Sequence, residues 1–218
     1  MRVTLATGTP AELALPTSGV ATRGLVLWPD IMGLRPLFDD HCERLANELG
    51  WAVCAPEPFP GLESMPLDER LAYVGNFDDQ AKLADAVAAA DTTGANPVGV
   101  IGFCMGGMYA LKCAASDRFD RVVGFYGMIR MPEAWEGPGQ GDALDAVRLA
   151  PRGKAMAIIG TADQWTPASE VDDLEAVGAM IIRYEGADHG FVHAPDRDSH
   201  RPVDAADAWS KAIAFLAT

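Results

Sequence analysis

The fold of this chain of 218 residues is decided by the stretch VGVIGFCMGG at residues 98–107. The apolar run at residues 97–101 is typical of a buried strand, and MYALKCAA at residues 108–115 is typical of a helix. A glycine-rich turn between them carries Cys104. A strand, a glycine-flanked turn and a helix form the nucleophile-elbow pattern G-x-S-x-G, here with cysteine in the serine position. We therefore predict that Cys104 is a nucleophile.

Glycines flank Cys104 at positions 102 and 106, where side chains would collide with the backbone of such a strained turn. The N-terminal end of the following helix points its positive dipole end at Cys104, which favours the thiolate. A lone cysteine after a strand is more often a small apolar residue of the core. The partners of Cys104 elsewhere in the chain decide between these interpretations.

Strands and helices alternate along most of the sequence. We expect strands at residues 2–6, 12–15, 23–28, 51–55, 97–101, 121–126, 155–160 and 179–184. We expect helices at residues 37–49, 67–90 with a break near Gly75, 108–115, 168–177 and 203–217, and irregular structure at residues 128–142. This pattern predicts a mostly parallel α/β sheet with helices on both faces. The length and a hydrophobic fraction of 49% fit a single domain over residues 1–218.

Four chemically active side chains follow predicted strands: Asp30, Cys104, Asp163 and His189. Ligands of parallel sheets bind beyond the carboxyl ends of the strands, so we expect these side chains to gather at one edge. A thiol nucleophile needs a base and a residue that orients the base. The chain order of nucleophile, acid and base is that of the Ser-Asp-His triads built on such elbows, which predicts a Cys104, Asp163, His189 triad.

Several stretches carry a family resemblance. They are LVLWPDIMGLRPLFDDHCERLA from Leu25, APEPFPG from Ala55, VGVIGFCMGG from Val98, FYG from Phe125, IIGTADQWTP from Ile158 and GADHGFVH from Gly186. Through them the chain resembles the dienelactone hydrolase family over nearly its whole length. The resemblance implies an α/β-hydrolase fold without a large cap domain. It also implies cleavage of a small carboxylic ester or lactone through an acyl-cysteine intermediate, without a metal ion or cofactor.

The resemblance also implies residue roles. Cys104 is the nucleophile, His189 the general base and Asp163 the residue that orients it. Asp30 stands at the position of a family acid that contacts the resting thiol and helps to activate it.

The oxyanion hole is formed, by the same resemblance, from the backbone N–H groups of Ile31 and Met105. Such donors stabilise the charge that develops on the carbonyl oxygen.

The candidate substrate-binding residues are Arg70, Tyr126, Trp135 and His193. His193 stands where well-known dienelactone enzymes carry an arginine that holds the substrate carboxylate, and Arg70 lies near the position of a second one. Recognition of a substrate carboxylate is therefore left open. Trp135 belongs to the irregular segment 128–142, which is either the lining of an apolar pocket or a plain surface loop.

Composition excludes several classes of partner. The formal net charge of −14 argues against nucleic acid and anionic membrane surfaces, because both require a basic patch. The four cysteines form no CxxC motif, and the N-terminal residues do not form a signal peptide, so we expect a cytoplasmic protein. No metal-ligand motif is present. The sequence does not predict the oligomeric state or which ester is cleaved.

Two alternatives to a dienelactone-like hydrolase stay open. One is a general carboxylesterase or thioesterase on the same scaffold. The other is a non-catalytic ligand-binding or redox-sensing protein in which Cys104 is oxidised rather than acylated.

Overall fold

The computed structural model describes residues 1–218, and its eight strands form one sheet in the order β1-β2-β4-β3-β5-β6-β7-β8. The strands are β1 (Arg2–Thr4), β2 (Pro10–Ala14), β3 (Gly24–Trp28), β4 (Ala52–Pro56), β5 (Val98–Phe103), β6 (Val122–Phe125), β7 (Ala155–Gly160) and β8 (Met180–Tyr184). β2 pairs antiparallel with both β1 and β4, and the six strands that run from β4 to β8 in the sheet pair in parallel. The predicted mostly parallel sheet is confirmed, and the two expected N-terminal strands pair as a hairpin.

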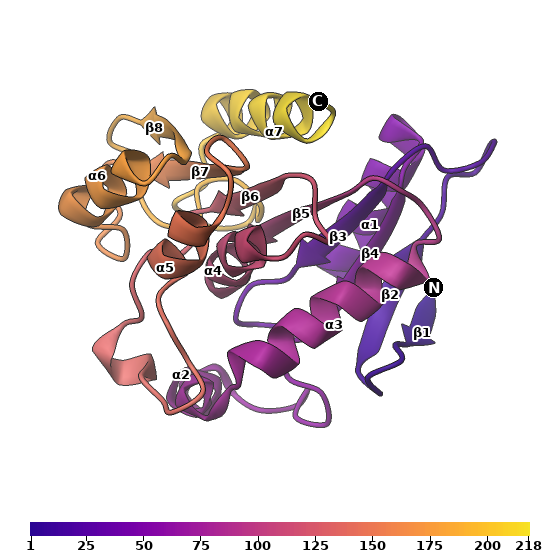
Figure 1. Cartoon of the computed structure of the whole chain (residues 1–218), viewed down its shortest axis with the longest axis horizontal. Helices are drawn as coiled ribbons and strands as arrows, with labels where there is room; N and C mark the ends of the chain where they lie inside the picture. Colours follow the sequence, from indigo (N-terminus) through magenta and orange to yellow (C-terminus); the bar gives the residue numbers. More distant parts are fainter.

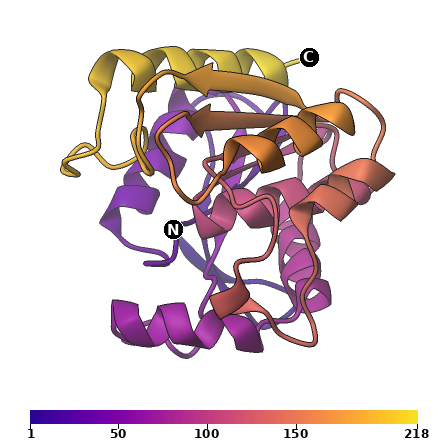
Figure 2. The ribbon, with the colours of Figure 1, turned by 90° about the vertical axis from the view of Figure 1, so that its left-hand side faces the viewer.

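Helices cover both faces of this sheet (Figure 1). They are α1 (Pro36–Leu49), α2 (Leu67–Tyr73), α3 (Asp79–Thr92), α4 (Met105–Lys112), α5 (Ala143–Leu149), α6 (Ala168–Ala176) and α7 (Pro202–Leu216). One apolar cluster joins α3, α4, α5 and α6 to the sheet, and a second joins α1 and α7 to it. Figure 2 shows α7 and α6 on opposite sides of β7 and β8. No helix has the length and apolar character needed to cross a membrane.

The segment predicted as one helix at residues 67–90 is divided. A short 3-10 turn at Val74–Asn76 separates α2 from α3. Asp78 then caps α3, because its carboxylate accepts a hydrogen bond from the backbone N–H of Gln80 at 2.8 Å. The break predicted near Gly75 is confirmed, and its cause is this new N-cap.

The ends of the parallel strands position the candidate site. Asp30 follows β3, Cys104 follows β5, Tyr126 follows β6, Asp163 follows β7 and His189 follows β8. Parallel strands present their carboxyl ends at a common edge, so residues far apart in the sequence meet there.

Candidate active site

Cys104 occupies a strained turn between β5 and α4, with φ 57° and ψ −121°. The turn requires glycines on both sides. A Cβ on Gly102 would lie 2.1 Å from the carbonyl oxygen of Gly106, and a Cβ on Gly106 would lie 2.2 Å from that of Pro29. The backbone N–H of Cys104 donates to the carbonyl of Phe125 at 3.0 Å, and the side chain stays partly exposed. Cys104 is therefore the only non-buried cysteine of the chain.

His189 and Asp163 lie together beside this turn. His189 Nδ1 is 2.8 Å from Asp163 Oδ2, and the other carboxylate oxygen accepts a hydrogen bond from the backbone N–H of Trp165 at 2.8 Å. Burial alone would lower the pKa of His189, but the Asp163 carboxylate and the neighbouring Cys104 sulfur raise it to about 10. Because Asp163 engages Nδ1, Nε2 is the ring nitrogen left for Cys104. The structure thus brings the three predicted triad residues together.

Two backbone N–H groups flank the elbow without backbone acceptors. Met105 is the first residue of α4, so its N–H has no intrahelical partner. Ile31 lies in the loop after β3, and its N–H donates no backbone hydrogen bond. The close approach of Gly106 to the carbonyl of Pro29 brings this loop against the elbow. Both donors expected for the oxyanion hole are therefore free beside the nucleophile.

The carboxylate of Asp30 is buried and fully engaged. Oδ1 accepts hydrogen bonds from the backbone N–H of Met32 at 2.9 Å and from Arg35 at 2.7 Å, and Oδ2 accepts from Arg35 at 2.8 Å. His193 Nε2 also lies 2.8 Å from Oδ2. Burial would raise the pKa of Asp30, but His193 and Arg35 hold it well below its usual range. The hydrogen bonds of Asp30 go to Met32, Arg35 and His193, and none goes to Cys104.

His193 and Tyr126 are both buried inside the site. Burial lowers the pKa of His193, so the ring is neutral. Its Nε2–H donates to the ionised Asp30, and Nδ1 therefore accepts from the Tyr126 hydroxyl at 2.5 Å. With both ring nitrogens engaged and no exposed surface, His193 does not fit the expected role of substrate contact. Tyr126 has φ 39° and packs edge-on against His189 at 5.2 Å between ring centroids, also without exposed surface.

Arg70 and Trp135 likewise do not fit the expected role of substrate contacts, because both are buried. The guanidinium of Arg70 donates to the backbone carbonyls of Met65 at 2.8 Å, of Ile31 at 3.3 Å and of Glu63. It therefore holds the loop that contains Ile31. Trp135 packs in the apolar cluster on the α4 side of the sheet, so segment 128–142 is neither an open pocket wall nor a plain surface loop at this position.

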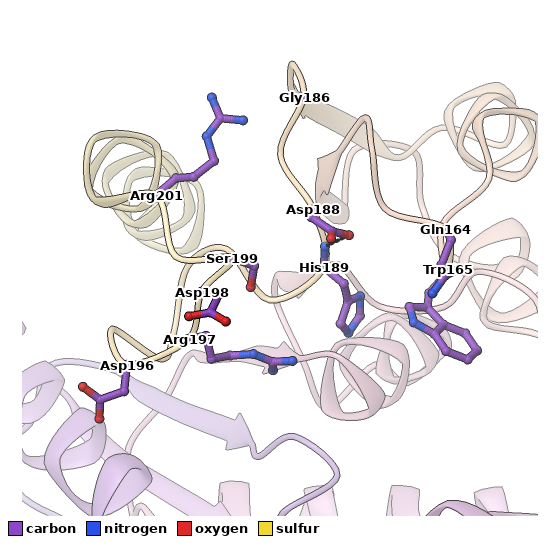
Figure 3. Close-up of a pocket in the computed structure, with 10 residues that line it drawn as sticks. All are labelled: Gln164, Trp165, Gly186, Asp188, His189, Asp196, Arg197, Asp198, Ser199 and Arg201. Atoms are coloured by element: carbon purple, nitrogen blue, oxygen red, sulfur yellow. Dashed lines mark hydrogen bonds between the residues drawn. The ribbon is translucent and has the colours of Figure 1, made fainter.

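A pocket of about 850 Å³ opens beside His189. Figure 3 shows Trp165 at one side of the His189 ring and Arg197 at the other. The sequence analysis did not select either residue. Trp165 lies two positions after Asp163, and this closeness to a predicted triad residue could have marked it as part of the site. Arg197 lies in the loop after β8, and only its charge distinguishes it in the sequence. No group of three histidine, cysteine or acidic side chains is arranged to hold a metal ion.

Comparison with known proteins shows the family of this chain. The dienelactone hydrolase family model matches residues 10–218. A carboxymethylenebutenolidase of Pseudomonas sp. (strain P51) is 31% identical over 84% of this chain and 79% of its own length. A probable 2-oxo-3-(5-oxofuran-2-ylidene)propanoate lactonase of Bradyrhizobium sp is 27% identical over 94% of this chain and 88% of its own length.

A solved structure from Klebsiella pneumoniae, assigned to dienelactone hydrolase, matches the fold with a TM-score of 0.85 at 22% identity. The match covers 100% of this chain and 98% of that one. The chain therefore belongs to the dienelactone hydrolase family of α/β hydrolases and is an ester or lactone hydrolase.

Proposed function

We propose that this protein hydrolyses a small carboxylic ester or lactone through an acyl-enzyme formed on Cys104, with His189 as general base and Asp163 as its orienting residue. The observation that carries the proposal is the His189 ring, fixed by Asp163 through Nδ1 at 2.8 Å and placed beside a sulfur on a strained turn. A nucleophile, a base and a residue orienting the base are the parts that acyl transfer requires.

In the first half-reaction, His189 Nε2 takes the proton of the Cys104 thiol. The sulfur attacks the carbonyl carbon, and the N–H groups of Ile31 and Met105 stabilise the resulting oxyanion. The tetrahedral intermediate then collapses, the C–O bond to the alcohol breaks, and His189 returns its proton to the departing oxygen. The product of this step is a thioester on Cys104.

In the second half-reaction, His189 removes a proton from a water molecule that attacks the thioester carbonyl. The C–S bond breaks, the acid leaves, and His189 returns its proton to the sulfur, which restores the starting thiol. Although burial would lower the pKa of His189, Asp163 and the Cys104 sulfur raise it, which stabilises the imidazolium formed when the thiol proton is transferred.

Asp30 tunes the resting thiol at a distance. Burial raises the pKa of Tyr126 well above its ordinary value, and its hydroxyl is linked to Asp30 through His193. Because the Tyr126 O–H donates to His193, it does not donate to the sulfur. The thiolate therefore lacks one stabilising donor and depends on His189. A cytoplasmic location belongs to the same proposal, and the four free cysteines are in keeping with it.

The test is a panel of aryl esters, lactones and acyl thioesters, with intact-mass measurement after rapid acid quenching. We expect turnover and an added acyl mass on Cys104 that is absent in Cys104→Ala. Preference for thioesters over oxygen esters would assign the protein as a thioesterase. Peroxide-driven oxidation of Cys104 without turnover of any substrate would contradict the proposal and support a redox sensor.

A further inference from the structure

Arg197 is the one lysine or arginine side chain of the protein that forms no hydrogen bond with another residue. The chain has 17 lysine and arginine residues. Each of the other sixteen donates a hydrogen bond to a carboxylate or to a backbone carbonyl. In a protein with a net charge of −14, a guanidinium that has no hydrogen-bond acceptor within the protein keeps its donors free for an anionic ligand.

The guanidinium of Arg197 lies against the backbone directly after the general base. Gly190 makes this approach possible, because a Cβ at this position would lie 2.9 Å from the Cζ of Arg197. Figure 3 shows the Arg197 side chain extending across the pocket toward His189, while the neighbouring Asp196 points away. The positive charge of Arg197 also acts on buried His193. Burial is the main cause of the lowered pKa of His193, and the charge of Arg197 adds to the decrease.

Acidic residues line the same pocket, yet none pairs with Arg197. Neither Asp188, Asp196 nor Asp198 forms a salt bridge with it. Asp188 instead accepts the backbone N–H of His189 at 2.6 Å. The donors of Arg197 therefore remain available to a bound molecule.

The positions expected to recognise a substrate anion are closed to it. Arg70 donates to backbone carbonyls, and His193 is bonded to Asp30 and Tyr126. The nearby Arg35 is also engaged, because it binds both oxygens of Asp30. On the other side of the His189 ring, the indole of Trp165 is 45% exposed in the pocket. The pocket thus offers a flat apolar surface and a free cation on either side of the base.

We propose that Arg197 is a specificity-determining residue that binds the carboxylate of the substrate, while Trp165 packs against its flat unsaturated or aryl part. This assignment rests on the proposed ester hydrolysis. The residue that binds the anion then belongs to the loop after β8, at the mouth of the pocket. A charge-assisted hydrogen bond at a partly solvated site is worth about 1.4 kcal/mol, or about tenfold in affinity.

The test uses matched pairs of anionic and neutral esters. One pair is 4-nitrophenyl hydrogen glutarate and its terminal primary amide, which differ in the acyl part. The other is 3-carboxyphenyl acetate and 3-carbamoylphenyl acetate, which differ in the alcohol part. We expect Arg197→Gln to raise KM about tenfold for the anionic member of one pair, with kcat and the neutral ester nearly unchanged. Arg197→Lys should restore part of the loss, and added salt should reduce the wild-type preference.

Arg201→Gln is the matched control, because Arg201 lines the same pocket but is paired with Asp204 at 2.7 Å. It should leave the preference for anionic esters in place. Equal effects of Arg197→Gln on anionic and neutral esters, or no wild-type preference in either pair, would overturn the assignment of Arg197 while leaving the hydrolase intact. Failure to hydrolyse all four esters, without an acyl adduct on Cys104, would instead contradict the proposed function.

Discussion

His193 Nε2 lies 2.8 Å from Asp30 Oδ2, and both side chains are buried. The contact joins the loop after β3 to the loop after β8. Arg35, which is more exposed to solvent, forms a salt bridge with the same Asp30 carboxylate. The first loop carries the free N–H of Ile31, and the second carries His189. This buried pair therefore fixes the distance between the oxyanion donor and the base.

The first prediction concerns the stability of this connection. We expect His193→Leu to lower the free energy of unfolding by about 3 kcal/mol, because it removes one partner of the buried Asp30 carboxylate and leaves the Tyr126 hydroxyl without an acceptor. Urea denaturation measures the change. His200→Leu is the control, since Nδ1 of His200 already lacks a partner. Equal losses in the two variants would show that the His193 pair does not stabilise the fold.

The second prediction concerns the nucleophile. We expect Cys104→Ala to reduce ester turnover by more than about a thousandfold while leaving the circular dichroism spectrum and the urea midpoint unchanged. The reason is that only the sulfur reacts, and alanine fits the same turn. Cys113→Ala, at a buried cysteine on the same side of the sheet, is the control for general loss of packing. Retention of most of the rate in Cys104→Ala would remove Cys104 from the mechanism.

The third prediction separates the two histidines of the site. We expect His189→Ala to lower kcat by about a hundredfold to ten-thousandfold, the usual contribution of a general base. His193→Ala should act mainly on stability and should cost much less in kcat. Steady-state kinetics at a temperature where both variants are folded provides the comparison. Similar losses in kcat would assign His193 a direct part in proton transfer.

The alternation of strands and helices was predictable from the sequence, whereas two helices differ from expectation. Residues 108–115 were predicted as helix, but α4 begins at Met105. Gly107 has low helix propensity, which hides this first turn in the sequence. Glycine is needed there because a Cβ would lie 2.6 Å from the carbonyl oxygen of Phe125. α5 was not predicted, because it has only seven residues and follows a segment rich in glycine and proline.

The candidate site was predictable only where a residue lies in the short segment that follows a strand. Cys104, Asp163 and His189 meet that condition, so strand order alone places them at one edge. The contact of His193 with Asp30 was not predictable, because it depends on the path of two loops that are 163 residues apart. No sequence pattern distinguishes Arg197 from any other surface arginine, since its lack of a partner is visible only in three dimensions.

The fourth prediction concerns acid pH and His41. Burial lowers the pKa of His41 from 6.5 to about 4, although its Nε2–H donates to the carbonyl of His193 at 2.8 Å. The unfolded chain binds this proton more readily, so the stabilising contribution of the neutral ring is present above pH 6.5 and is lost as the pH falls to about 4. We expect the stability advantage of wild type over His41→Gln to shrink by a few kcal/mol across that window. A pH-independent difference in urea unfolding would contradict the assignment.

The fifth prediction concerns Asp30, which carries a negative charge near the nucleophile without bonding to it. Asp30→Asn removes that charge and leaves the Arg35 guanidinium without its carboxylate. Both changes favour the thiolate of Cys104. We therefore expect the resting thiol of the variant to react faster with iodoacetamide at neutral pH.

Ester turnover should fall in the same variant, because asparagine replaces one acceptor oxygen with an NH2 donor and cannot keep all four hydrogen bonds that the carboxylate accepts from Met32, Arg35 and His193. The loop carrying Ile31 then loses its fixed position. Asp120→Asn is the matched control: Asp120 also pairs with an arginine, Arg23 at 2.7 Å, but it precedes β6 at the opposite end of the sheet. It should change neither alkylation nor turnover. Unchanged alkylation and turnover in Asp30→Asn would mean that Asp30 only caps its turn, through the hydrogen bond that Oδ1 accepts from the N–H of Met32.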